Sequence, residues 1–445
     1  MYFIEGCFTK FIDNDFIVFN PVNFSVAILP EFRMRFKKSK IDELTVHDYF
    51  INYCKSHQYD VDLLMAPEEQ SEIARFFSNR IKYQNQLTIG DIPSYKCNLN
   101  CVYCFENHFS LNNKPLPFEL RFQLLSDIIN CYRSSISAID YIFFGGEPLL
   151  NDEYIESTCI ELSKKFPDKI KKYSCTTNGT ILTDRFIKTI NNFQFTEIRV
   201  TLDGTKLVHD SRRKTSNEQG SFVQILDNLK RICVETDVNI LINTVLDTEN
   251  QSVYLDMINM LSERFSDYMF GNKARFIFNI GYTCSPMIQT EHTKTQMKCE
   301  ESIHSHYYFL AEQLLKKGLT ITQPFYSTHC LNSCEKAFMI DPLGDIYKCI
   351  TGVHSDHFLL SSYRDFYSNP QGLLKANIHH IENAHQRKCG NCKFLMMCNG
   401  GCKFQKQIHN QEVCRYSLLN NEMDSLLNLL YIGEINDEEY FQQRI

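Results

Sequence analysis

Three kinds of segment are missing from this chain of 445 residues. There is no run of about 18 apolar residues, so we expect no transmembrane helix. There is no long basic run, and the net charge is −7, which disfavours nucleic acid because phosphate binding usually leaves a positive footprint. The opening residues, MYFIEGCFTKFIDND, are acidic where a signal peptide has a basic and then an apolar segment. We therefore expect a cytoplasmic protein with no membrane and no nucleic-acid partner.

Cysteine, in contrast, is abundant, with 19 residues. Disulfides are not expected in a reducing compartment, so clustered cysteines indicate metal binding. Eleven of the cysteines fall into three tight groups. The other eight are scattered, and most of them are interpreted as small buried hydrophobic residues: Cys7, Cys54, Cys131, Cys159, Cys175, Cys233, Cys284 and Cys299.

Hydrophobic patterning divides the chain into three regions. Residues 1–85 are predicted to form a small α+β module, in which strand-like stretches precede helical patterns. Residues 86–322 alternate six short strands with longer helices, which predicts a parallel sheet with right-handed crossovers. Residues 323–445 are rich in cysteine and end in a helix whose leucine stripe is interpreted as packing. The predicted fold class is α/β, with a partial (β/α)6 barrel of the TIM type and chemistry at the carboxyl ends of its strands.

The expected elements are assigned by their residue ranges. In the N-terminal module, strands are expected at 15–19 and 24–29 and helices at 43–57 and 68–81. In the barrel, strands are expected at 88–96, 138–146, 172–179, 197–204, 238–247 and 274–281, and helices at 117–134, 151–166, 183–193, 220–235 and 249–265.

The first cysteine group directly follows the first barrel strand. Cys97, Cys101 and Cys104 place three thiols within eight residues, a spacing that suits an iron–sulfur cluster or a metal ion. A structural zinc site would normally have a fourth ligand, and the nearest candidate is His108. A site with three protein ligands leaves one metal position open for chemistry.

Each of the next three strands is also followed by a polar or glycine-rich motif. Glycines allow the backbone to approach a ligand closely, and carboxylates and arginines suit ammonium and carboxylate groups. The motifs are Gly145-Gly146-Glu147-Pro148, Thr176-Thr177-Asn178-Gly179, Thr201-Leu202-Asp203-Gly204 and, shortly afterwards, His209-Asp210 with Arg213.

In their order and spacing, these motifs resemble those of the radical S-adenosylmethionine (SAM) superfamily. The resemblance implies a [4Fe–4S] cluster on Cys97, Cys101 and Cys104, whose fourth iron binds SAM. It implies that an electron from the cluster cleaves SAM and yields a 5′-deoxyadenosyl radical. It also implies a SAM pocket formed by Tyr103, Gly145, Gly146, Glu147, Pro148, Thr177, Asn178, Thr201, Asp203 and Arg213.

The second and third cysteine groups resemble the SPASM extension of radical SAM enzymes at every spacing. The resemblance implies two further [4Fe–4S] clusters, three in total, with electron transfer as the role of the additional pair. The implied ligands are Cys330, Cys334, Cys349 and Cys402 for the first auxiliary cluster, and Cys389, Cys392, Cys398 and Cys414 for the second. A non-catalytic protein with zinc-binding cysteines is the alternative from another class.

The resemblance further implies a peptide or protein substrate and an electron donor of the flavodoxin or ferredoxin type. The favoured reading is maturation of a ribosomally made precursor peptide through a thioether, ether or carbon–carbon crosslink. Residues 1–85 would then bind the leader peptide, or else extend the barrel packing. The alternative is an anaerobic sulfatase-maturating enzyme, which forms formylglycine. Ile350 argues against it, because those relatives have an aspartate after the cysteine that matches Cys349, although Asp341, Asp345 or Asp356 could substitute.

Overall fold

The computed structural model describes most of the barrel and parts of the two ends of the chain. The predicted helices at 43–57 and 68–81 lie outside the described residues, as do His108, Cys389 and Cys414. The described residues are 2–4, 7–12, 15–20, 26–29, 85–104, 106, 114–282, 300–322, 330–382, 392, 394, 398, 402, 404 and 416–436.

A ten-stranded sheet forms the centre of the described structure, in the order β13-β12-β11-β9-β8-β7-β5-β14-β15-β16. Every pair from β13 to β14 is parallel, and β15 and β16 are added antiparallel. The strands are β5 (Gln86–Asp91), β7 (Ala138–Phe143), β8 (Ile170–Thr177), β9 (Phe195–Thr201), β11 (Asn239–Leu246), β12 (Phe276–Tyr282), β13 (Thr320–Ile321), β14 (Ala337–Ile340), β15 (Ile346–Tyr347) and β16 (Leu359–Ser361).

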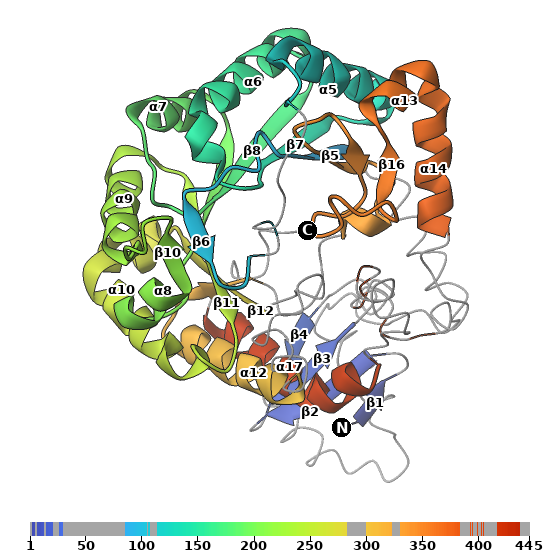
Figure 1. Cartoon of the computed structure of the whole chain (residues 1–445). Helices are drawn as coiled ribbons and strands as arrows, with labels where there is room; N and C mark the ends of the chain where they lie inside the picture. Colours follow the sequence, from blue (N-terminus) through green and yellow to red (C-terminus); the bar gives the residue numbers. More distant parts are fainter. Residues whose placement is uncertain are drawn as a thin grey trace.

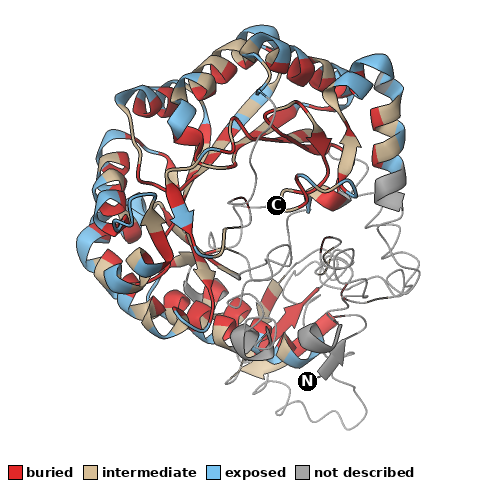
Figure 2. Cartoon of the chain, viewed as in Figure 1, coloured by how far each residue is buried: buried red, intermediate tan, exposed pale blue. Residues whose placement is uncertain are grey.

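Helices cover the outside of the curved sheet (Figure 1). Their inward faces are buried and their outward faces are exposed, as the amphipathic patterns predict (Figure 2). The predicted α/β fold with a partial TIM-type barrel is therefore confirmed. The helices are α5 (Phe118–Tyr132), α6 (Asp152–Lys165), α7 (Asp184–Asn192), α8 (Lys206–Arg212), α9 (Phe222–Glu235), α10 (Tyr254–Met269), α12 (Glu300–Lys316), α13 (Tyr363–Ser368) and α14 (Pro370–Glu382).

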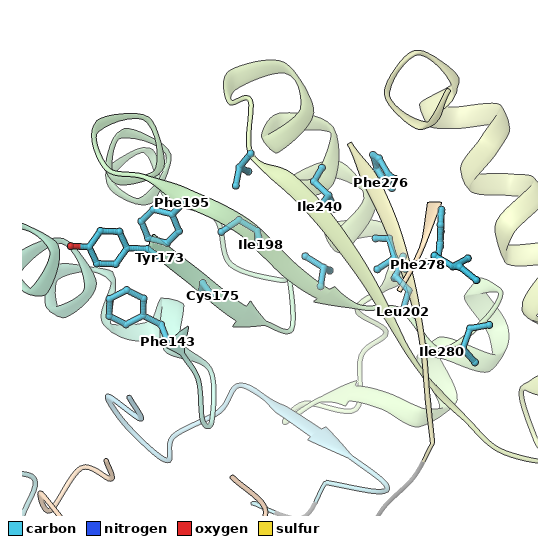
Figure 3. Close-up of a cluster of buried hydrophobic side chains, with 14 of the residues drawn as sticks. Phe143, Tyr173, Cys175, Phe195, Ile198, Leu202, Ile240, Phe276, Phe278 and Ile280 are labelled. Atoms are coloured by element: carbon cyan, nitrogen blue, oxygen red, sulfur yellow. The ribbon is translucent and has the colours of Figure 1, made fainter. Parts of the chain in front are cut away.

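Aromatic and branched side chains of the strands form the core between sheet and helices (Figure 3). Tyr173 on β8 stacks on Phe195 on β9, with 5.5 Å between ring centroids. Phe186 of α7 meets Phe195 edge-on at 5.8 Å. Strands buried by helices favour such large apolar residues. This packing fixes the strand ends from which the candidate site is built.

Strand β14 lies beyond the boundary expected at residue 323, but it belongs to the barrel sheet. It pairs in parallel with β5, with Ala337 opposite Thr88 and Ile340 opposite Asp91. A fully buried arginine, Arg121 of α5, joins the two strands. Its guanidinium pairs with the Asp91 carboxylate and donates to the carbonyls of Ile92 (2.8 Å) and Ile340 (3.1 Å). The barrel sheet and the cysteine-rich region are therefore continuous at β14, and the domain boundaries remain a prediction.

The N-terminal residues form a separate antiparallel sheet in the order β1-β2-β3-β4. Its strands are β1 (Tyr2–Ile4), β2 (Cys7–Ile12), β3 (Asp15–Phe19) and β4 (Val26–Leu29). Strands β3 and β4 were expected, and β1 and β2 were not. The C-terminal helix α17 (Tyr416–Asn436) lies against this sheet and against α12 (Figure 1).

Two contacts connect α17 to the N-terminal sheet. Tyr431 donates a hydrogen bond to Asp15 at 2.8 Å, and Lys10 pairs with Asp424 at 3.2 Å. Met423, Leu426, Leu427 and Leu430 are buried, so the leucine stripe packs as expected. Among the described residues, no helix is both long enough and apolar enough to cross a membrane.

Candidate active site

The first cysteine group lies on a loop that a short strand pair holds in place. Strand β6 (Leu99–Cys101) pairs antiparallel with β10 (Arg213–Thr215), and Cys101 lies opposite Arg213. The Val102 amide also donates to the Arg212 carbonyl at 3.0 Å. Cys101 is buried, whereas Cys97 and Cys104 are half-buried. All three thiols therefore come from one segment that is anchored at the mouth of the barrel.

The turn after β7 packs directly on the backbone of the cysteine loop. Gly145 and Gly146 have φ angles of +85° and +31°, in the region that favours glycine. A Cβ atom on Gly146 would lie 2.3 Å from the Lys96 carbonyl oxygen, so only glycine fits there. The Glu147 amide donates to the same oxygen at 2.8 Å, and Pro148 begins the 3₁₀ turn η2 (Pro148–Asn151). The turn after β7 therefore lies against the backbone of the residue that precedes Cys97.

The Glu147 carboxylate is fully buried and is held by its own neighbours. It accepts hydrogen bonds from the Thr177 hydroxyl (2.6 Å) and from the amides of Asn178 (2.7 Å) and Leu149 (3.0 Å). Burial raises the pKa of this carboxyl group, and these hydrogen bonds counteract the shift. Its described contacts thus connect the ends of β7 and β8.

Asn178 extends this connection to the cysteine loop. Its side-chain NH₂ donates to the side-chain oxygen (Oδ1) of Asn98 at 2.8 Å and approaches the Cys97 sulfur at 3.7 Å. The Asn98 NH₂ donates in turn to the Thr180 hydroxyl at 2.8 Å. The turn after β8 and the first cysteine therefore share one polar network. Asn98 was not singled out in the sequence, because no motif marks it.

A second polar network joins the cysteine loop to the end of β9. Asp203 is fully buried. It accepts hydrogen bonds from the Tyr103 hydroxyl and from the Val245 amide (3.0 Å). Arg213 donates to the Tyr103 oxygen at 2.5 Å and lies 3.9 Å from the Asp203 carboxylate. The structure therefore brings together Tyr103, Asp203 and Arg213, three residues of the predicted pocket. Thr201, a fourth, is buried at the end of β9.

Two arginines surround Tyr103. The Arg212 guanidinium lies 5.1 Å from the centroid of the Tyr103 ring, and Arg212 also pairs with Asp247 at 2.7 Å. Burial raises the pKa of the Cys97 and Cys101 thiols, and the positive charge of Arg213 counteracts the shift at Cys101. A nearby cation favours the thiolate, which is the form that ligates iron.

Glu106 is a buried carboxylate at this site that the sequence motifs did not identify. Its side chain accepts a hydrogen bond from the Gly146 amide at 2.8 Å. Burial raises its pKa to about 7, and the hydrogen bond from Gly146 opposes that shift. The sequence gives no signal that Glu106 is a site residue, because an isolated glutamate after the cysteine motif looks the same as a surface glutamate.

The cysteine-rich region gathers part of the first predicted auxiliary set. Burial raises the pKa of Cys349 to about 12, and the thiols of Cys330 and Cys402 lie close enough to raise it further. Cys349 and Cys402 also border one apolar cluster with Tyr95 and Phe404. Cys334 is buried at the end of the 3₁₀ turn η5 (Leu331–Ser333). Of the second set, Cys392 and Cys398 are half-buried.

The donor set suits an iron–sulfur cluster. Within the described part of the chain, no three His, Cys, Asp or Glu side chains converge closely enough to hold a single metal ion. Thiolates around a four-iron cluster lie farther apart than thiolates around one tetrahedral zinc ion, because irons and sulfides occupy the centre. The thiol-only ligands, the buried surroundings and the adjacent arginines therefore fit such a cluster.

Comparison with known proteins agrees with this site. Residues 92–261 match the family model of the Radical SAM superfamily. A cysteine-type anaerobic sulfatase-maturating enzyme of Clostridium novyi is 25% identical over 71% of this chain and 87% of its own. Mycofactocin maturase MftC of Mycobacterium tuberculosis is 24% identical over 70% of this chain and 77% of its own.

Two solved structures share the fold. Native anSMEcpe with bound AdoMet, the same molecule as SAM, superposes with a TM-score of 0.61 at 17% identity, covering 79% of this chain and 100% of its own. Streptococcus suis SuiB bound to precursor peptide SuiA superposes with a TM-score of 0.52 at 14% identity, covering 89% and 94%.

Residues 92–261 therefore form a domain of the Radical SAM superfamily, as the motifs predicted, and the protein is an enzyme. Within that superfamily it is related to maturases of proteins and peptides. The family implies SAM and a [4Fe–4S] cluster as cofactors.

Proposed function

We propose that this enzyme carries three [4Fe–4S] clusters and introduces a thioether, ether or carbon–carbon crosslink into a ribosomally made precursor peptide. Cys97, Cys101 and Cys104 hold the SAM-binding cluster. When bound, that cluster and SAM supply a 5′-deoxyadenosyl radical that removes a hydrogen atom from the peptide. A flavodoxin- or ferredoxin-like protein supplies the electron.

The chain's own residues shape the SAM pocket and keep water out. Gly145 and Gly146 allow the cofactor to approach the backbone, and Glu147, Thr177 and Asn178 keep that turn rigid through buried hydrogen bonds. Pro148 begins the turn that closes one side of the pocket.

Arg213 supplies a cation on the other side of the proposed SAM pocket. It is positioned by Tyr103 and Asp203, while Thr201 lines the end of β9. A buried arginine held in this way suits the SAM carboxylate. Together the two sides of the pocket orient the cofactor for cleavage.

The auxiliary clusters are assigned by cysteine spacing. Cys330, Cys334, Cys349 and Cys402 hold the first, and Cys389, Cys392, Cys398 and Cys414 hold the second. The proximity of Cys349 to Cys330 and Cys402 supports the first assignment. With all ligands supplied by protein, electron transfer is the role of both clusters.

The observation that favours crosslinking over formylglycine formation is that the carboxylates close to Cys349 in the sequence are poorly placed to act as a general base. Ile350 occupies the position of the aspartate in sulfatase-maturating relatives. The possible substitute Asp341 is fully buried, where it accepts hydrogen bonds from the Tyr95 hydroxyl (3.1 Å) and from the amides of Leu343 and Asp345 (both 2.9 Å). These contacts give Asp341 a structural role in its turn and leave it unsuited to act as a general base.

Two other carboxylates near Cys349 are also unfavourable as general bases. Asp345 accepts the Tyr363 amide at 3.3 Å, and Asp356 is exposed to solvent. Formylglycine formation is nevertheless the second candidate function, because the relative from Clostridium novyi catalyses the maturation of sulfatases.

We also assign leader-peptide binding to the N-terminal sheet. An antiparallel sheet with short outer strands, β1 and β4, offers edges to which an extended leader could be added as a strand. The contacts of Tyr431 and Asp424 on α17 with this sheet support the competing reading, a packing extension. Titration of a labelled precursor with the enzyme distinguishes them. Affinity that depends on the leader, and not on the core, supports leader binding, whereas affinity that resides in the core alone contradicts it.

Co-expression with a candidate precursor tests the proposed reaction. A crosslink removes two hydrogens from the peptide, whereas formylglycine formation at a cysteine removes its sulfur, so mass spectrometry separates the two outcomes. The variant in which Cys97, Cys101 and Cys104 are all alanine is the control and should leave the precursor unchanged. The anaerobically purified enzyme should contain about 12 irons per chain. A colourless protein with two or three zinc ions would instead indicate the non-catalytic alternative.

A further inference from the structure

A fully buried lysine lies between two predicted ligands of the first auxiliary cluster. Lys348 immediately precedes Cys349 and follows β15, and its amide donates to the Phe358 carbonyl at 2.9 Å. No motif marks Lys348, and none of the roles assigned above uses it.

The side chain of Lys348 reaches back to the segment that begins with Cys334. Its ammonium group donates to the carbonyls of Cys334 and Ala337, the latter at 2.8 Å. It also lies 4.9 Å from the centroid of the Phe338 ring. Carbonyl oxygens and an aromatic face are the partners that an ammonium group needs when it is buried. The Lys348 ammonium group is therefore fixed beside the backbone carbonyl of Cys334.

The residues next to this ammonium group include ligands of the predicted first auxiliary set. Cys334 contributes the carbonyl that holds the lysine, Cys349 is the next residue in the chain, and Cys330 and Cys402 lie close to Cys349. Four thiolates with iron and sulfide make an anionic cluster, and reduction adds one more negative charge. A fixed cation beside such a cluster stabilises the reduced form more than the oxidised form, so it raises the reduction potential.

We infer that Lys348 is a positioning residue of the first auxiliary cluster: its ammonium group raises the reduction potential of that cluster and holds the Cys334 backbone in place. This inference rests on the proposed function, because it requires the auxiliary cluster. A higher potential makes the oxidised cluster a better electron acceptor.

A second buried lysine in the same segment provides a matched control. Lys336 is 6% exposed, but its ammonium group donates to the Ser135 carbonyl at 2.9 Å, on the barrel side. Replacing either lysine by methionine removes a buried charge while keeping a chain of similar length. Only the substitution at position 348 removes the charge held by the Cys334 carbonyl.

The test uses full-length, anaerobically reconstituted protein in which Cys97, Cys101 and Cys104 are alanine, so that only auxiliary clusters contribute signals. Lys348→Met and Lys336→Met are introduced separately, and iron content and reduction potentials are measured, the latter by electron paramagnetic resonance. The expected result is about eight irons per chain in all three proteins, with one potential shifted downward in Lys348→Met and unchanged in Lys336→Met. Full iron with the same potentials in all three proteins overturns the inference and leaves the proposed function intact. A parent protein without iron would refute the proposed clusters themselves.

Two further variants cover the case in which Lys348→Met loses its iron. Lys348→Gln keeps a donor for the carbonyl groups but lacks the charge, and Lys348→Arg keeps the charge. Retention of iron and of the parent potential in Lys348→Arg, together with a lowered potential or lost iron in Lys348→Gln, supports the inference. Loss of iron in Lys348→Arg, or parent behaviour in Lys348→Gln, assigns Lys348 to packing alone and overturns it.

Discussion

The two regions that carry the predicted cluster ligands are built differently. At the barrel mouth, neighbouring strand ends and the cysteine loop are joined by hydrogen bonds among Glu147, Thr177, Asn178 and Asn98. In the cysteine-rich region, the described predicted ligands come from three separate segments, 330–334, 349 and 392–402. The barrel site is thus shaped by the sheet, whereas the proposed auxiliary clusters would connect segments that are far apart in the sequence.

The largest expected effect is the loss of the SAM-binding cluster. Replacing Cys97, Cys101 and Cys104 by alanine should reduce the release of 5′-deoxyadenosine to background, on the order of a thousandfold or more, because the electron source is lost. The hydrogen bonds at the strand ends remain, so the far-ultraviolet circular dichroism should be unchanged. Liquid chromatography of the reaction mixture measures the release.

The control for that experiment is Cys131→Ala, which changes an exposed cysteine of α5. It should release 5′-deoxyadenosine at the parent rate. Release by the triple variant at the parent rate would contradict the assigned mechanism.

Replacing a single ligand of the first auxiliary cluster should have a different effect. Cys349→Ala should lose about four of the 12 irons and reduce crosslinked product roughly tenfold or more. SAM should bind with parent affinity, because the barrel site is separate. Iron analysis, mass spectrometry and calorimetry measure the three quantities.

Thermal unfolding sharpens the comparison between the two regions. The melting temperature of Cys349→Ala should fall, because the loss of iron frees the loops that it ties together. An equal loss of SAM affinity and of product in this variant would contradict a separate role for the auxiliary site.

A smaller effect is expected within the barrel network. Thr177→Val removes the hydroxyl that donates to Glu147 and accepts the Gly179 amide at 3.0 Å. Leaving buried polar groups unsatisfied should lower the free energy of unfolding by about 2 kcal/mol. Urea unfolding measures this, with Thr176→Val on the same strand as the control. Equal stability of the two variants would contradict the structural importance of this network.

The smallest effect should come from a charged residue of β7 away from the cysteines. Burial, assisted by the charge of Glu197, raises the pKa of Asp140 to about 6. A carboxyl group whose pKa is raised in the folded state destabilises that state increasingly between its ordinary pKa and its raised pKa, and fully above the raised pKa. Asp140→Asn should therefore be more stable than the parent by about 1 kcal/mol at about pH 8.

This advantage of Asp140→Asn should shrink below about pH 6 and vanish below the ordinary pKa of 3.8. Urea unfolding at several pH values measures it. A difference in stability that does not vary with pH would assign the effect to packing.

The barrel was predictable from sequence because its pattern is local. Between Gln86 and Tyr282 all the expected strands and helices are present, and each motif follows its strand, whereas α8 and the short strands β6 and β10 were not expected. The cysteine, glycine and TLDG motifs could be located in the sequence because their chemistry requires particular residue types in a fixed order.

The features that were not predicted depend on partners far away in the sequence. Nothing in the residues of β14 indicates that Phe338 pairs with Ile89 of β5. The same holds for Glu106, whose partner Gly146 is 40 residues away, and for Asn98, whose partner Asn178 is 80 residues away. Short strands such as β1 (Tyr2–Ile4) contain too few residues to show a period.

The parallel pairing of β14 with β5 has a consequence for electron transfer between the two proposed clusters. Cys97 follows β5 and Cys349 follows β15, and β14 lies between these two strands in the sheet. Arg121 bonds the backbone at the ends of β5 and β14. In the proposed function, the sheet and not the length of a linker would therefore set the distance between the SAM-binding cluster and the first auxiliary cluster.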